Sequence, residues 1–184
     1  MKYDSRDTVT GLLDREAFLR VIDDVVEDRG DEYDTFSVLV LDVDRSRLSF
    51  GVRGAQLADR LTRMLAERVE DLVASAGVVA RLGATVFGVL PHGAPDDRDV
   101  VDLPARLHKM LRAPFEIDGE EVCVTTSIGV AVAPARTEGV SRLLRVRADA
   151  ALYVAKHNGR DRVELWQEGQ ATRASETRGT IGDP

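Results

Sequence analysis

The stretch that decides the fold reads VVARLGATVFGVL, residues 78–90. Two apolar runs flank the segment 82–85, which contains a glycine, and this pattern predicts a β-hairpin. Arg81 places a charge at the shoulder of the hairpin, where solvent or a ligand phosphate could meet it. We favour a structural role, in which it pairs with a nearby acid. The hairpin predicts a β-sheet, so the remaining segments are candidates for further strands and for helices that cover them.

The composition is that of one globular domain. The chain has 184 residues, 43% of them hydrophobic, and its 25 Lys and Arg against 32 Asp and Glu give a net charge of −7. This balance argues against nucleic acid as a partner. The lone Cys123 lies in an alternating apolar run, which predicts a buried, inert thiol in a reducing compartment. With no signal peptide and no apolar run of about 18 residues, the sequence predicts a cytoplasmic protein without a membrane anchor.

Four segments carry apolar residues at helical spacing. The predicted helices cover about residues 15–29, 57–72, 101–112 and 140–157. Asp14 is the expected N-cap of the first helix. Pro104 is expected in the first turn of the third helix, where its missing N–H does no harm.

The predicted strands lie between these helices. Residues 36–41 form a β-rich run, residues 115–117 and 121–132 flank an Asp-Gly turn, and residues 162–166 make a last strand. The order predicts an α/β sandwich with a central mixed, mostly antiparallel sheet covered by helices. We expect one domain over residues 1–166 and a disordered tail over residues 167–184.

Four motifs in order carry a family resemblance. They are DTVTGLLDR at 7–15, LDVD at 41–44, VTTSIGVA at 124–131 and ADAALYVAKHNGRDRV at 148–163. Together with the hairpin they resemble the GGDEF family, the diguanylate cyclases, over nearly the whole predicted domain. The resemblance implies a fold similar to the palm of nucleotide cyclases, in which two domains face each other and join two GTP molecules into cyclic di-GMP.

The resemblance also implies roles for particular residues. Asp42 would be a metal ligand, assisted by the carbonyl of Val43. Asp59 would hydrogen-bond the guanine, and Lys156 with Arg160 would hold the terminal phosphates. In this family, carboxylates hold divalent ions that neutralise the phosphates during phosphoryl transfer.

The signature turn departs from the family pattern. Where the family has Gly-Gly-Asp/Glu-Glu-Phe, this chain has Gly83, Ala84, Thr85, Val86 and Phe87. Thr85 replaces the metal-binding acid, and a hydroxyl neutralises no charge on Mg²⁺. Ala84 adds a methyl group where the backbone should approach a phosphate closely.

Two further departures lie outside the turn. Phe50 stands where an asparagine would read the guanine. The allosteric product site, Arg-x-x-Asp in the family, reads Ala-Ser-Ala-Gly at residues 74–77, so no such cyclic di-GMP site is expected.

Structural roles remain open for several of these residues. Asp42 and Asp44 can be solvated, helix-capping carboxylates instead of metal ligands. Lys156 and Arg160 can complement the dipole of the last helix. His108, like His157, is expected to be isolated on a polar helix face, without metal-ligand company.

These observations leave two classes of function. The first, which we favour, is a GGDEF-type signalling module with no catalytic residues, acting in cyclic di-GMP regulation through a protein partner in trans or another GGDEF domain as homodimer or heterodimer. The start of the domain close to Met1 favours action in trans. The alternative is an active diguanylate cyclase with a rearranged metal site that uses Asp44. A third interpretation, a GTP sensor, shares the lack of catalysis with the first class. We expect no required cofactor, although Mg²⁺ could accompany bound GTP.

Overall fold

The computed structural model describes residues 5–30, 32–44, 54–93 and 98–167, and the predicted tail lies outside this part except for residue 167. The elements follow in the order α1 (Arg15–Arg29), β1 (Thr35–Asp44), α2 (Gly54–Val73), a 3-10 turn (Ala74–Ala76), β2 (Gly77–Arg81), β3 (Val86–Pro91), α3 (Arg98–Leu111), β4 (Phe115–Ile117), β5 (Glu120–Val122), β6 (Thr125–Pro134), α4 (Val140–His157) and β7 (Val163–Leu165).

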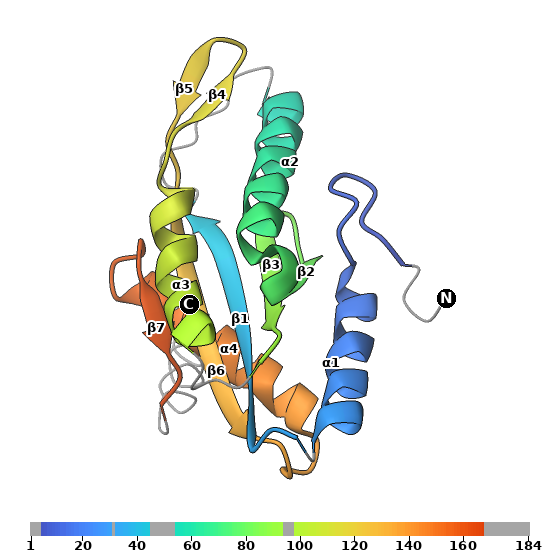
Figure 1. Cartoon of the computed structure of the whole chain (residues 1–184). Helices are drawn as coiled ribbons and strands as arrows, with labels where there is room; N and C mark the ends of the chain where they lie inside the picture. Colours follow the sequence, from blue (N-terminus) through green and yellow to red (C-terminus); the bar gives the residue numbers. More distant parts are fainter. Residues whose placement is uncertain (1–4, 31, 45–53, 94–97, 168–184) are drawn as a thin grey trace, which may run out of the picture.

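The predicted fold class is confirmed. The main sheet has the strand order β2-β3-β1-β6-β7, in which only the β6–β7 pair is parallel. Strands β4 and β5 form a separate two-stranded hairpin, which Figure 1 shows beyond the end of the main sheet. The predicted signature hairpin is β2 and β3, joined by residues 82–85.

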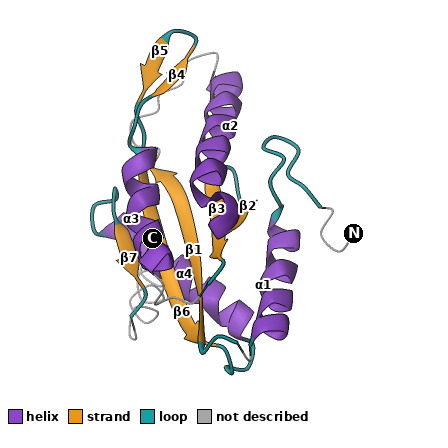
Figure 2. Cartoon of the chain, in the orientation of Figure 1, coloured by secondary structure: helices purple, strands orange, loops and turns teal. Residues whose placement is uncertain are grey.

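The central strand β1 is buried on both faces, because helices cover the sheet from both sides. Leu39 and Leu41 point into a core formed with α2 and α3, while Val38 and Val40 point into a core formed with α1 and α4. This alternation is the two-residue period of a strand. Figure 2 shows α2 and α3 in front of the sheet and α4 behind it.

Gly129 explains how closely α4 packs on β6. A Cβ atom at this position would lie 2.2 Å from the carbonyl oxygen of Ala148 and 2.2 Å from the backbone nitrogen of Leu152. No side chain fits there, so the helix backbone rests directly on the strand. This close packing positions the C-terminal end of α4, which carries Lys156, over the sheet.

The first helix begins and ends as predicted. Asp14 is the N-cap, its carboxylate accepting a hydrogen bond of 2.8 Å from the backbone of Ala17. The pKa of Asp14 is lowered, first by this backbone hydrogen bond and then by the Ser5 hydroxyl.

Three local predictions were wrong. Helix α3 begins at Arg98, so Pro104 lies inside the helix instead of in its first turn. The run 121–132 is divided between β5 and β6, which belong to different sheets. Cys123 is exposed, because it lies in the connection between these two strands, on the outward side of the alternation.

Within the described ranges, no helix is long and apolar enough to span a bilayer.

Candidate functional site

The candidate site lies where β1 ends beside the signature turn. Asp42 is paired in register with Val86 of β3 on one side and with Ser127 of β6 on the other. Its carboxylate is largely buried, with 13% of the side chain exposed. A carboxylate in this position is desolvated and requires partners.

Both oxygens of the Asp42 carboxylate have partners from elsewhere in the chain. Oδ1 accepts a hydrogen bond of 2.7 Å from the Thr85 hydroxyl of the signature turn. Oδ2 accepts a hydrogen bond from the Nζ atom of Lys156, with which Asp42 forms an ion pair. The structure therefore brings together three of the residues singled out in the sequence, Asp42, Thr85 and Lys156.

Asp44, two residues further along β1, is more deeply buried, with 4% of its surface exposed. Its carboxylate accepts hydrogen bonds from the hydroxyls of Ser127 at 2.8 Å and Thr125 at 3.0 Å, and from the backbone nitrogen of Asp161 at 3.1 Å. These three donors satisfy the hydrogen-bonding capacity of the buried carboxylate oxygens. Asp44 thus ties β1 to β6 and to the segment that follows α4.

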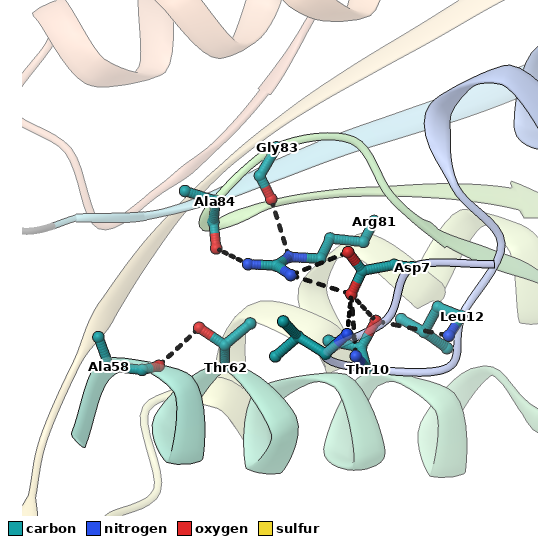
Figure 3. A network of polar contacts seen from close by, with 9 residues as sticks. Asp7, Thr10, Leu12, Ala58, Thr62, Arg81, Gly83 and Ala84 are labelled. Atoms are coloured by element: carbon teal, nitrogen blue, oxygen red, sulfur yellow. Dashed lines mark hydrogen bonds and ion pairs between the residues drawn. The ribbon is translucent and has the colours of Figure 1, made fainter. Parts of the chain in front are cut away.

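A second ion pair holds the signature turn from the other side. The Nη1 atom of Arg81 lies 2.9 Å and 3.0 Å from the two carboxylate oxygens of Asp7. The same guanidinium donates to the carbonyl oxygens of Gly83 at 3.1 Å and Ala84 at 2.9 Å. Figure 3 shows the guanidinium lying between the turn and the N-terminal loop. The predicted structural role of Arg81 is confirmed.

The electrostatics of Asp7 follow from these contacts. Burial acts to raise the pKa of Asp7, but hydrogen bonds from Thr10 and Arg81 and the charge of Arg81 outweigh it, so the pKa lies below its ordinary value. The hydroxyl and the backbone N–H of Thr10 each donate to Asp7 at 2.8 Å. Asp7 therefore stays ionised and fixes the N-terminal loop against β2.

The remaining predicted site residues stay apart from this cluster. Asp59 lies exposed on α2, and Arg160 lies exposed just after α4 with a φ of 63°. In the part of the chain that the structure describes, no hydrogen bond or ion pair joins their side chains to Asp42 or Lys156. Val43 is buried in the core, and its backbone N–H donates to the Thr85 carbonyl at 3.3 Å. Phe50 lies outside the described residues.

One polar cluster was missed in the sequence. His108 of α3 lies 3.0 Å from Asp161, and Arg112 pairs with the same carboxylate at 3.3 Å. The prediction that His108 is isolated was therefore wrong. Arg112 directly follows the last residue of α3 and lies four residues after His108, a spacing that places two side chains on one side of a helical turn, but only the fold brings them to Asp161.

The fold agrees with comparisons to known proteins. A sequence profile described as "Diguanylate cyclase, GGDEF domain" matches residues 4–162. This chain belongs to the GGDEF family. The bifunctional diguanylate cyclase/cyclic di-GMP phosphodiesterase MucR of Pseudomonas aeruginosa is 34% identical over 142 residues, which make up 77% of this chain. They amount to only 20% of MucR, so the chain spans about a fifth of the length of that relative.

Solved structures confirm the GGDEF fold. The GGDEF domain of TpbB (YfiN) from Pseudomonas aeruginosa aligns with a TM-score of 0.80 at 24% identity, covering 93% of this chain and 99% of that one. Diguanylate cyclase SiaD of the same organism, solved in complex with its activator SiaC, aligns with a TM-score of 0.74 at 25% identity. That alignment covers 89% of this chain and 62% of SiaD.

The signature turn of this GGDEF domain contains no acidic residue. Its positions are Gly83, Ala84, Thr85, Val86 and Phe87. The third position hydrogen-bonds Asp42 through a hydroxyl, and the last two contribute side chains to the two hydrophobic cores. No group of three or more His, Cys, Asp or Glu side chains converges as a metal site in residues 5–30, 32–44, 54–93 and 98–167.

Proposed function

We propose that this GGDEF domain is a non-catalytic signalling module in cyclic di-GMP regulation that acts through protein partners. The observation that carries the proposal is the pairing of Asp42 with Lys156 and Thr85. The residue expected to hold the metal and the residue expected to hold the phosphates neutralise each other. A site of this kind needs neither ligand to be stable.

The donor set does not fit Mg²⁺ as it stands. Mg²⁺ is usually held by one or two carboxylates plus substrate phosphates, in near-ideal octahedral geometry. The turn supplies no carboxylate, and the one carboxylate at its side, Asp42, already neutralises the Lys156 ammonium. A cation here would have to displace Lys156 from Asp42, against the repulsion between like charges.

The alternative, an active cyclase with a rearranged metal site, has to recruit Asp44. That carboxylate is buried and accepts three hydrogen bonds, from Thr125, Ser127 and Asp161. Turning it toward a metal would leave these donors unsatisfied, at about 1–3 kcal/mol for each buried group. This cost supports the non-catalytic assignment over the active one.

GTP binding without catalysis is compatible with the same proposal. Lys156 can hold a phosphate only after it leaves Asp42, which lowers its affinity for GTP by the free energy of the ion pair. A protein partner, or a second GGDEF domain, does not require this step. The SiaD–SiaC complex shows a cyclase of this fold bound to an activator protein, and we extend that mode of regulation to this chain only as a proposal.

The test of catalysis is a product assay. Purified protein is incubated with GTP and Mg²⁺, and cyclic di-GMP is measured by mass spectrometry beside a diguanylate cyclase with an intact signature turn. We expect no product above a protein-free blank. Product formation that disappears in Asp42→Asn would overturn the proposal.

The test of nucleotide binding is a calorimetric titration of GTP with Mg²⁺. A saturating isotherm weakened by both Lys156→Ala and Asp59→Ala would assign a GTP sensor. Lys109→Ala, which removes an exposed lysine, is the control. An equal reduction of the heat in this variant would assign nonspecific binding.

The triple variant Ala84→Gly, Thr85→Asp and Val86→Glu restores the acids of the family turn. Recovery of cyclic di-GMP synthesis in this variant would locate the lesion in the turn.

A further inference from the structure

Helix α4 has a second, mostly apolar stripe besides the one that it buries. The helix packs against β6, β1, β7 and α1, and its buried residues are Val140, Leu144, Ala148, Ala151, Leu152 and Ala155. A different set, the outer stripe, is partly or fully exposed and consists of Leu143, Val146, Ala150, Tyr153 and His157. At about 3.6 residues per turn, the outer stripe lies on the side of the helix roughly opposite the buried residues. Helix α4 is therefore largely apolar on two faces, of which the sheet covers one.

The outer stripe has the spacing of a surface that packs against another helix. Its residues follow one another after three, four, three and four positions, which is the alternation of the a and d positions in a coiled coil. The Val146 side chain within it is 55% exposed. At its C-terminal end the rings of Tyr153 and His157 stack, with centroids 3.8 Å apart. A partner helix with apolar residues at the same spacing fits this surface.

The charges of α4 are basic, although the chain as a whole is acidic. The helix has one acid, Asp149, against four cations, which are Arg142, Arg145, Arg147 and Lys156. Two of these cations are paired, Arg145 with Asp149 at 3.7 Å and Lys156 with Asp42. Within the described ranges, Arg142 and Arg147 form no ion pair.

These two arginines flank the outer stripe. With Leu143 at an a position, Arg142 occupies g and Arg147 occupies e, the positions at which charges select the partner in a coiled coil. The guanidinium of Arg147 lies over the Trp166 ring, 3.9 Å from its centroid, so it is held in place beside the stripe. The stripe therefore presents apolar side chains between two cations that lack an acid.

From these observations we infer that the outer stripe of α4 docks an acidic amphipathic helix of a partner protein. Apolar side chains of that helix pack on the stripe, and its carboxylates pair with Arg142 and Arg147. A second copy of α4 does not fit, because it would bring the same excess of cations against this one.

The inference rests on the proposed function, action through protein partners, and assigns a surface and a class of partner to it. The surface is separate from the Asp42 site. Arg142 and Lys156 are 14 residues apart on α4, roughly 21 Å at about 1.5 Å per residue. A helix docked over the N-terminal half of α4 therefore leaves the signature turn uncovered.

The experiment is an NMR titration of the whole chain, labelled at Val and Leu methyl groups. The probe is a synthetic peptide of three heptads with Leu at a and d and Glu at e and g. We expect saturable shifts of the methyl signals of Leu143 and Val146. The signals of Val101, which is 58% exposed but lies on α3 at the other face of the sheet, should stay unchanged. Shifts that do not saturate, or equal shifts at Val101, would overturn the inference.

Two further peptides separate charge from packing. A peptide with Lys in place of every Glu is repelled by Arg142 and Arg147 and should bind at least ten times more weakly. A scrambled peptide keeps the composition and charge of the acidic probe but has no apolar stripe, and it should also bind at least ten times more weakly. Equal binding of the basic peptide, or equal binding of the scrambled one, would contradict the assignment.

Variants of the chain test the surface itself. Val146→Glu places a charge in the exposed part of the stripe and should weaken binding of the acidic peptide at least ten-fold. Val101→Glu, at a valine of similar exposure on α3, is the matched control and should leave the affinity unchanged. Arg142→Glu reverses a cation without an ion pair and should weaken binding three- to ten-fold, with a smaller difference from the wild type at high salt. Unchanged affinity in Val146→Glu, or an equal loss in Val101→Glu, would refute the docking site.

Other occupants of the stripe give different results. Self-association of the free chain that Val146→Glu abolishes would assign the stripe to a second copy. Binding to anionic lipid vesicles that the same variant abolishes would assign it to a membrane surface. Either result, without saturable binding of the acidic peptide, would overturn the inference. The readout is binding alone, so it fails or succeeds independently of the cyclic di-GMP assay that tests the proposed function.

Discussion

Two ion pairs hold the signature turn, and they are built differently. On one side, Arg81 contacts both carboxylate oxygens of Asp7 and two carbonyl oxygens of the turn. On the other side, Lys156 contacts a single oxygen of Asp42. The Arg81 side chain is 13% exposed and that of Lys156 is 31% exposed. The first pair is a multidentate clamp, and the second is a single contact at the edge of solvent.

This difference in geometry gives the two ion pairs different roles in the site. A guanidinium is a rigid fork whose hydrogen bonds fix the positions of its partners, whereas an ammonium is a mobile point charge on a flexible chain. Arg81 therefore determines the shape of the turn. Lys156 holds Asp42 through a single contact that is more exposed to solvent.

Loss of the Arg81 clamp should have the largest effect. Arg81→Ala leaves Asp7 partly buried without its cation and removes the donor to the Gly83 and Ala84 carbonyls. We expect the free energy of unfolding to fall by about 2–4 kcal/mol, measured by urea denaturation. Arg81→Lys should recover only part of this loss, because an ammonium cannot reach all of these acceptors at once. A loss below about 1 kcal/mol would show that the two pairs do not differ as described.

Loss of the Lys156 contact should have a smaller effect on stability. Lys156→Ala leaves Asp42 with the Thr85 hydroxyl as its remaining partner, and we expect a fall of about 1–2 kcal/mol in the free energy of unfolding. Lys109→Ala, an exposed lysine on α3, is the matched control and should change it by less than about 0.5 kcal/mol. Equal effects of the two variants would mean that the Lys156–Asp42 pair contributes nothing to the fold.

The contrast between these pairs also shows what the sequence can predict. The family motifs predicted that Asp42 and Lys156 belong to one site. The hairpin pattern predicted that Arg81 pairs with an acid. The sequence could not show that Lys156 reaches Asp42, because 114 residues separate them and the packing of α4 on the sheet, close at Gly129, brings them together. The burial of Asp44 among three donors was equally invisible, since the donors come from β6 and from the segment after α4.

For the fold, periodicity predicted the helices and the main strands but not where the chain changes sheet. Alternation between outward and inward residues continues from Glu121 to Val124, through the point where β5 ends. A two-residue period reports which side of a strand is buried and carries no information about the neighbouring strand. For this reason Cys123 was assigned to a buried strand although it lies exposed in a connection.

The hydroxyl of Thr85 should make a smaller contribution than either cation. Thr85→Val keeps the shape of the side chain and removes its 2.7 Å hydrogen bond to Asp42. We expect a loss of about 1 kcal/mol or less in the free energy of unfolding. Thr85→Ser, which retains the hydroxyl, should lie closer to the wild type. If Thr85→Val is neutral, Lys156 alone suffices to satisfy Asp42.

The Asp7–Arg81 pair has one further effect, which is visible only in acid. Because the folded pKa of Asp7 lies below its ordinary value, the unfolded chain binds more protons than the folded one between the two pKa values. The stabilisation from ionised Asp7 is therefore complete above the unfolded value, about 3.9, and is lost as the pH falls through the folded value. Urea denaturation of the wild type and Asp7→Asn across this range should give a difference in unfolding free energy that is constant near neutral pH and shrinks in acid. A difference that stays constant down to pH values well below about 3 would show that Asp7 does not titrate with the clamp.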